Sequence, residues 1–171
     1  WSTDRLEESF QDDPGQWSGI RILSGSKGNV FRSNIIRNSI IGIEVDSSAN
    51  LILDKTAIHT TAGTGLIGVH ANISALNCLF ANNGTSSFEA LHGGDYLFDH
   101  CTFANFGTDR PALSLANFRC LDVPSCSNVL VNDLDFKAVN CIVTGSLDDE
   151  ISLSNIDVLS GQSSGAEFCY N

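Results

Sequence analysis

The segment "CLFAN" at residues 78–82 returns as "CTFAN" at residues 101–105, and this near-repeat decides the fold. Each copy belongs to a longer stretch, "LNCLFAN" or "DHCTFAN", that aligns with "SNIIRN" (33–38) and "KTAIHT" (55–60) at a nearly constant spacing. A fixed period of this kind is the signature of a repeat architecture. The alignment puts one large apolar residue at the same position of each unit: Ile36, Ile58, Phe80 and Phe103.

A second column has the same period. The segments "GIRIL" (19–23), "GIEVD" (42–46) and "GLIGV" (65–69) begin with glycines that follow one another at equal spacing. We expect Gly19, Gly42 and Gly65 to lie at bends that need a permissive backbone. The pattern resumes in "NCIVTG" (140–145) and "EISLSNI" (150–156) after an interruption at 117–128, which we interpret as a loop insertion.

Each repeat unit is too short to bury its own apolar residues. It contains two or three runs rich in Ile, Val, Leu or Phe, separated by Gly, Asn, Ser and Asp, which indicates short strands joined by tight turns. Such units must stack on their neighbours. The sequence therefore predicts an all-β fold, a right-handed parallel β-helix with coils of about 22–23 residues, in which residues 1–171 form a single domain. We expect the chain to be truncated at one or both ends.

The repeated asparagines follow the third strand of each predicted coil. Alternation along the strand points Phe80 and Phe103 inward. At the next bend Asn38, Asn82 and Asn105 fall in one column, with Thr60 in the second coil. An inward Asn can satisfy backbone groups at a bend and bond to the Asn of the next coil. We expect this column to be structural.

The six cysteines divide into three groups. The first group stands in the inward column and is predicted to consist of buried thiols: Cys78, Cys101 and Cys141. A bridge between Cys78 and Cys101 remains open, since neighbouring coils bring α-carbons within disulfide range. Cys120 and Cys126 flank a short Pro-containing loop and are the predicted disulfide. Cys169 is unassigned, and no cysteine and histidine spacing typical of zinc occurs.

The charge balance is strongly acidic. Twenty Asp and Glu against nine Lys and Arg give a net charge of −11 at neutral pH, which argues against nucleic acid and phosphate-rich membrane surfaces as partners. No apolar run approaches the roughly 18 residues of a membrane span. We predict no transmembrane segment.

Several stretches resemble a group of exported right-handed β-helix proteins from Bacteroidetes bacteria, within the pectin-lyase-like superfamily. The resemblance is carried by "PGQWSGI" (14–20) and "GGDYLFDHCTFAN" (93–105), and more weakly by "IIGIEVD" and "NCIVTGSLDDEI". It implies a secreted or cell-envelope protein, often a lipoprotein whose anchoring cysteine would precede Trp1. It implies no particular reaction.

Motifs of polysaccharide-cleaving β-helix enzymes are missing. The hydrolases resemble one another in "NTDG", "GHG" and "RxK" motifs that accompany paired acids, and the acidic doublets at 12–13 and 148–149 lie in terminal or turn-like segments instead. The lyases carry an aspartate cluster that holds calcium, to which "FDHCT" (98–102) is loosely similar. The sequence favours a non-catalytic protein without cofactor or metal. Carbohydrate binding or polysaccharide cleavage is the alternative, with calcium expected under the lyase case alone.

Candidate ligand-binding residues stand in the outward columns. Glu44 and Glu89 share a predicted column with Arg21 and Ile67, and His70 and His92 lie one coil apart near the column of Asp46. Stacked histidines can bind a metal or a proton, whereas the plainer interpretation is a pair of solvated turn residues. In "HGGDY" (92–96), Asp95 and Tyr96 follow two glycines. Tyr96 is either a sugar-stacking ring or part of the core.

The N-terminal region offers a cap for the first coil. An indole of Trp17 or Trp1 can cover the open edge or stack on a sugar, and we expect Trp17 to cap. The preceding "RLEESFQDD" (5–13) is predicted to form a short helix or loop over that edge.

Taken together, these features predict a structural or interaction module of a cell-surface or secreted bacterial protein. Its expected partner is another protein or the remaining coils of a larger chain, with polysaccharide as the alternative.

Overall fold

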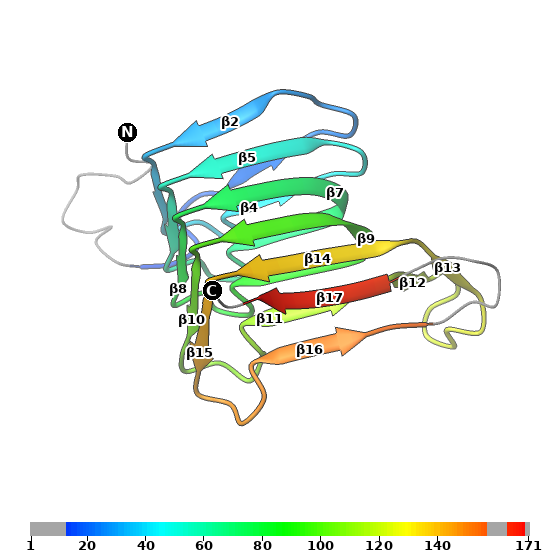
Figure 1. Ribbon diagram of the computed structural model, residues 1–171. Helices are drawn as coiled ribbons and strands as arrows, with labels where there is room; N and C mark the ends of the chain where they lie inside the picture. The colour runs from blue at the N-terminus through cyan, green and yellow to red at the C-terminus, as the bar shows by residue number, and fades with distance from the viewer. Residues whose placement is uncertain (1–12, 157–163, 170–171) are drawn as a thin grey trace.

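The computed structural model describes residues 13–156 and 164–169, and the strands among them form a right-handed parallel β-helix with three faces (Figure 1). The first face contains β1 (Ile20–Ile22), β4 (Ile43–Val45), the first part of β7 (Leu66–Leu76), the first part of β9 (Phe88–Asp99), β11 (Leu113–Ala116) and β16 (Ile151–Ser154). The second face contains β2 (Asn29–Arg32), β5 (Asn50–Asp54), the second parts of β7 and β9, β14 (Leu134–Val139) and β17 (Ser164–Cys169). The third face contains β3 (Ile35–Arg37), β6 (Ala57–His59), β8 (Leu79–Ala81), β10 (Thr102–Asn105) and β15 (Ile142–Gly145).

The strand register confirms both repeats found in the sequence. On the third face Ile36, Ile58, Phe80 and Phe103 pair in succession across four coils. On the first face Arg21, Glu44, Ile67 and Glu89 do the same. The coils therefore stack in register apart from one irregularity between Val69 and Ala71, where β9 has one residue more than β7. Side chains at matching positions of successive coils share a column.

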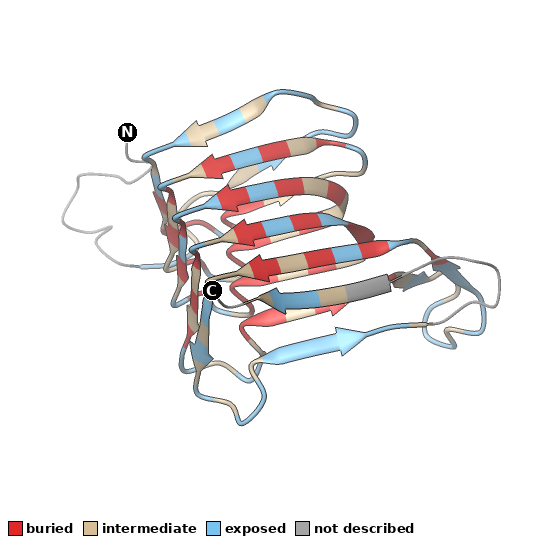
Figure 2. Cartoon of the chain, viewed as in Figure 1, coloured by how far each residue is buried: buried red, intermediate tan, exposed pale blue. Residues whose placement is uncertain are grey.

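The core lies inside the coil and follows from strand alternation (Figure 2). Buried positions alternate with outward ones along β5, β9 and β14, as expected for strands with one buried face. Phenylalanines fill the centre, and the rings of Phe80 and Phe103 stack with centroids 5.1 Å apart. Phe98 contacts both of these rings from the second face.

The prediction for the asparagine column was partly wrong. Asn38 and Asn82 occupy equivalent turns and have positive φ angles of 60° and 51°, but the Asn82 side chain is exposed. The buried polar column is shifted by one residue. Thr61 Oγ1 donates to Asn83 Oδ1 (2.9 Å), and the Asn83 N–H donates to Asn105 Oδ1 (2.9 Å).

The shift has a simple backbone cause. A residue in the left-handed conformation turns the chain sharply, so the next side chain, rather than its own, points into the coil. Asn105 is buried because it is the last residue of β10 and lacks a positive φ. Asn38 is buried because residues 15–17 lie over it, with the Gln16 N–H donating to the Asn38 carbonyl (2.8 Å).

The reason expected for the repeated glycines holds for Gly19 and fails for Gly42. Gly19 has a φ of 103°, which needs the permissive backbone of glycine. Gly42 lacks a positive φ, but a Cβ placed there would lie 2.1 Å from the Gly65 carbonyl oxygen. Close approach of two coils, not backbone freedom, therefore requires glycine at position 42.

The interruption predicted at 117–128 is a β-hairpin between β11 and β14. Its strands, β12 (Phe118–Cys120) and β13 (Val129–Val131), pair antiparallel, so the insertion continues a few residues beyond the predicted end. Cys120 and Cys126 form the predicted disulfide. Cys78 and Cys101 are free thiols in this structure, and no bridge joins them.

Trp17 is partly buried against the first coil. Trp17 forms a bridge with Ser39, its indole Nε1 donates to the Arg37 carbonyl (2.9 Å), and the ring packs against the core, as expected for a cap. Trp1 and residues 5–12 of the predicted helix or loop lie outside the described residues. The described residues contain no helix long and apolar enough to cross a membrane.

Candidate functional site

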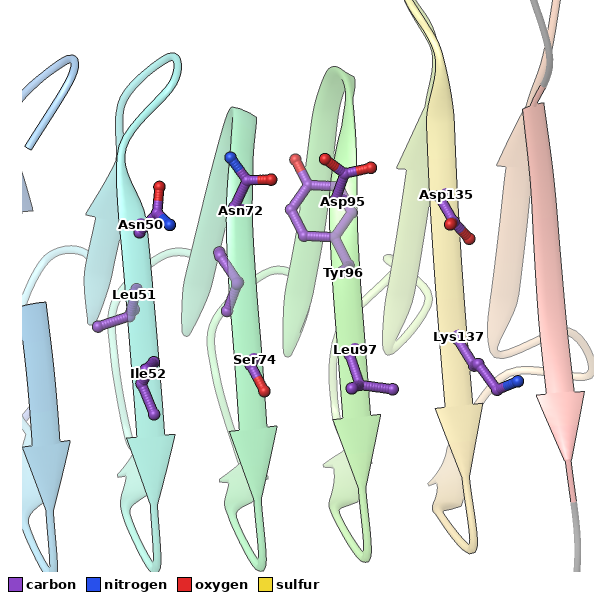
Figure 3. A pocket seen from close by; sticks show the side chains of 11 residues that line it. Asn50, Leu51, Ile52, Asn72, Ser74, Asp95, Tyr96, Leu97, Asp135 and Lys137 are labelled. Carbon is purple, nitrogen blue, oxygen red and sulfur yellow. The ribbon is translucent and has the colours of Figure 1, made fainter. Parts of the chain in front are cut away.

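A groove of about 440 Å³ crosses the second face over β5, β7, β9 and β14 (Figure 3). Parallel pairing aligns these four strands so that each contributes the same two outward positions to the groove. The groove therefore runs along the axis of the β-helix, across the strands. Because every position is set by backbone hydrogen bonds of the sheet, its floor is rigid.

Two outward columns line the groove, and Figure 3 shows both. The polar column consists of Asn50, Asn72, Asp95 and Asp135, one residue from each strand. The second column, two residues further along each strand, consists of Ile52, Ser74, Leu97 and Lys137. Ile52 and Leu97 are 46% and 43% exposed, so apolar surface lies beside the amides and carboxylates.

The groove carries negative charge at one end. Asp95 and Asp135 are exposed and pair in register on adjacent strands. Neither carboxylate forms an ion pair with another described residue, whereas Lys137 Nζ lies 3.0 Å from Glu167 Oε2. The hydrogen bond and the charge of Glu167 raise the pKa of Lys137. The one lysine of the groove is thus already paired with an acid outside it.

Tyr96 is part of the core and does not offer a sugar-stacking ring. Its side chain is buried beneath the groove, and the hydroxyl donates to the carbonyl oxygens of Gly93 (2.8 Å) and Gly68 (3.1 Å). Burial raises the pKa of Tyr96 above its usual range. The ring is 5.1 Å from that of Phe88, centroid to centroid. Its neighbour Asp95 points outward because strand residues alternate.

His70 and His92 lie at the corner between the first and second faces. Both have positive φ angles, 48° and 66°, where β7 and β9 bend. Burial, together with the charge of Arg119 and the neighbouring His70, lowers the pKa of His92. The carboxylate of Asp46 instead accepts two hydrogen bonds from Arg21, at 3.0 and 3.1 Å.

No metal centre is built from the described part of the chain. Among those residues there is no group of three or more His, Cys, Asp or Glu side chains that could hold an ion. The Asp99 carboxylate of "FDHCT" contacts the Nδ1 of exposed His100 at 2.7 Å rather than a second acid.

Glu44 and Glu89 lie on the first face and do not reach the groove. Glu44 is 3.6 Å from Arg21, and Glu89 accepts a hydrogen bond from Thr64 Oγ1 (2.9 Å). Ile67 separates the two glutamates in their column. The six sequence candidates therefore fall in four places: the first face, the corner, the groove and the core.

The sequence interpretation missed most of the groove. Asn50, Asn72 and Asp95 follow one another at the spacing of one coil, so the period contained the signal for these three. Asp135 does not follow Asp95 at that spacing because the hairpin intervenes, and no period could have aligned it.

Comparison with known proteins identifies the architecture. The model of a protein family described as "right handed beta helix region" matches residues 9–106, more than half of the chain. No curated protein and no solved structure matches this sequence. The matched region includes β1 to β10 and contributes three of the four strands beneath the groove.

Proposed function

The chain belongs to the family of right-handed β-helix regions, and from this premise we propose that it is a non-catalytic interaction module of a secreted or cell-surface bacterial protein. The observation that carries this proposal is the groove on the second face, with its polar column beside exposed Ile52 and Leu97. The resemblance of "PGQWSGI" and "GGDYLFDHCTFAN" to exported β-helix proteins supports the location.

The partner we propose is a protein segment that carries Lys or Arg beside apolar side chains. Asp95 and Asp135 supply two neighbouring negative charges, and the net charge of −11 attracts cationic segments over a longer range. Ile52 and Leu97 would bury apolar side chains of the partner, and Asn50 and Asn72 would hydrogen-bond its backbone or side chains.

Rigidity makes the groove suited to binding. Its residues stand on strands held by neighbours on both sides, so binding orders little of this protein. Catalysis is not proposed because the motifs that accompany paired acids in the hydrolases do not occur in the sequence, although Asp95 and Asp135 are neighbours. The lysine of the groove is paired with Glu167, and no metal cluster occurs among the described residues.

The test uses defined probes on the folded protein. A synthetic peptide of alternating Lys and Leu is titrated against the isotope-labelled chain, with a Glu and Leu peptide of the same length as the control probe. We expect amide shifts at residues 50–52, 72–74, 95–97 and 135–137 with the cationic peptide. The double variant Asp95→Asn/Asp135→Asn is expected to weaken binding by about two- to thirtyfold, since each of the two exposed ion pairs contributes ~0.2–1 kcal/mol.

A matched double variant separates local contacts from net charge. Asp148→Asn/Asp149→Asn removes the same charge from the exposed loop between β15 and β16. It is expected to weaken binding by less than about twofold, because screening limits exposed charges to about 10 Å. Equal weakening in both variants, or shifts outside the groove, would overturn the proposal.

The same labelled protein also tests whether the groove binds a carbohydrate. Acidic and neutral polysaccharides are added with and without calcium, and groove shifts and release of shorter products are both followed. Product release would establish the polysaccharide-cleaving alternative and refute the non-catalytic proposal. Groove shifts without release would replace the protein partner with a carbohydrate.

A further inference from the structure

Three thiols stand in one column where the second face turns into the third. Cys78, Cys101 and Cys141 each directly precede a strand of the third face, and these strands pair in the register Leu79, Thr102, Ile142. The cysteines therefore face one another across three successive coils. The Cys101 N–H donates to Cys141 Sγ at 3.4 Å, which places that sulfur directly beside the middle cysteine.

The three positions differ in access. Cys78 and Cys101 are buried, with 3% and 1% of their surface exposed, whereas Cys141 is partly exposed. Cys141 is thus the position of the column that is most open to solvent. Strands of adjacent coils lie about 4.8 Å apart, which is within the range of α-carbon separations that a disulfide bridges.

Hydrogen bonding along the column lowers the pKa of both outer thiols, Cys78 and Cys141, of which only Cys141 is partly exposed. The thiol of Cys101, together with the Cys101 N–H, lowers the pKa of Cys141 to about 7 against the opposing effect of burial. The pKa of Cys101 is raised, because its thiol hydrogen-bonds to both neighbouring sulfurs and is buried. A lowered pKa favours the thiolate, which is the nucleophilic form of cysteine.

We propose that Cys141 is a thiol-modification site for small-molecule disulfides, and that Cys101 resolves the adduct into a Cys101–Cys141 disulfide between adjacent coils. The Cys141 thiolate attacks one sulfur of the reagent, whose S–S bond breaks; half of the reagent stays on Cys141 and half leaves as a thiol. Cys101 then loses its proton, attacks Cys141 Sγ and expels the second half as a thiol. Two protein thiols are oxidised, and one reagent disulfide is reduced to two thiols.

The link would span the inserted hairpin. Residues 106–133 leave the third face, form the hairpin and return to β14, so a Cys101–Cys141 bridge closes the chain around this excursion. The site lies inside the coil and shares no residue with the groove. Its test is therefore independent of the proposed interaction function.

The experiment treats the folded chain with oxidised glutathione, blocks remaining thiols in acid and maps tryptic fragments without reduction. Trypsin cuts after Lys and Arg but not at Arg110-Pro111, so Cys101 lies in fragment 56–119, Cys141 in 138–171, and the Cys120–Cys126 disulfide in 120–137. The double variant Cys78→Ser/Cys169→Ser leaves one free thiol in each outer fragment. We expect 56–119 to become linked to 138–171 in this variant and in the unaltered chain.

A third substitution identifies the order of events. Adding Cys101→Ser to the double variant removes the resolving thiol, so Cys141 is expected to keep one glutathione. The pH dependence of the linkage rate is measured in the double variant, which keeps the Cys101 thiol that lowers the pKa of Cys141. Unlinked outer fragments in the double variant would overturn the proposal. So would a disulfide confined to fragment 56–119 in the unaltered chain, which would show that Cys78 rather than Cys141 pairs with Cys101.

Discussion

At the scale of single residues, left-handed turn positions explain why asparagine recurs. One non-glycine residue with positive φ stands between the second and third faces in every complete coil, and the set is Ser33, Lys55, Asn77, His100 and Asn140. A second set follows the third face and includes Asn38, Thr60 and Asn82. Asparagine tolerates this conformation better than most residues, so backbone geometry accounts for Asn38 and Asn82. Asn105 lacks a positive φ and belongs to the buried hydrogen-bonded column instead.

Asn82 and its neighbour Asn83 allow a direct test of this explanation. Asn82→Gly is expected to change the free energy of unfolding by less than ~0.5 kcal/mol, because glycine adopts positive φ freely, whereas Asn82→Ala costs ~1 kcal/mol. Asn83→Ala is the matched control and should cost ~1–2 kcal/mol, since it removes the buried Asn83 Oδ1 that accepts from Thr61, while the bond from the Asn83 N–H to Asn105 is kept. Urea denaturation measures all three, and a large loss for Asn82→Gly would restore the stacking role.

At the scale of elements, the hairpin of β12 and β13 has its own organisation within the insertion. A disulfide closes its loop, and the Asp122 carboxylate accepts hydrogen bonds from the Asn128 N–H (2.8 Å) and from Ser125 Oγ (2.9 Å) as well as from Ser127. The hairpin strands pair with each other and with no strand of the coils. It can therefore loosen without unfolding the β-helix.

Acid is expected to loosen this loop before it affects the coils. The hydrogen bonds from Ser127, the Asn128 N–H and Ser125 lower the pKa of Asp122 to about 2 from an ordinary value of 3.8. Because the folded pKa is depressed, the stabilising contribution is complete above pH ~4 and is lost as pH falls toward ~2. The Asn128 amide shift and its exchange protection, followed from pH 5 to pH 2, should report this loss.

Two substitutions check that Asp122 causes the transition. Asp122→Asn should remove the pH dependence at Asn128, because the side chain no longer titrates. Asp109→Asn, in an exposed loop after β10, should leave the profile at Asn128 unchanged. A profile that survives in Asp122→Asn would assign the transition to another group.

At the scale of the whole molecule, the stacked coils make stability a nearest-neighbour property. The pairings of the third face connect each coil with the one before and the one after it. Packing energy is therefore shared between adjacent coils and not across the full stack. The predicted single domain is thus a series of coupled layers.

Double-mutant cycles should show this directly. Phe80→Leu and Phe103→Leu alter two stacked rings of adjacent coils, and we expect a coupling energy above ~0.5 kcal/mol. Ile36→Val and Phe136→Leu lie in coils separated by three others, and their effects on the free energy of unfolding should add within ~0.5 kcal/mol. Strong coupling between the distant pair would refute the nearest-neighbour description.

The sequence by itself determined the fold class, the coil length, the inward and outward columns and the Cys120–Cys126 pair. The fold class, coil length and columns depend on a period and on strand alternation, and the cysteine pair depends on a short loop between its two residues. A linear sequence contains each of these local properties. Only the tertiary structure decided which side chains at the turns are buried and which positions require glycine. A left-handed residue moved the buried polar column from Asn82 to Asn83, and contact between coils required Gly42.

The groove also depended on tertiary structure. Strand alternation was compatible with Tyr96 in the core, but only packing against Phe88 and the Gly68 and Gly93 carbonyls decided it. Asp135 lies beside Asp95 because the hairpin is inserted outside the stack of coils, and β14, which follows it, pairs in register with β9. The period specifies which residues share a column. Where an insertion interrupts the period, hydrogen bonding between strands decides the neighbours, and that is a property of the folded chain.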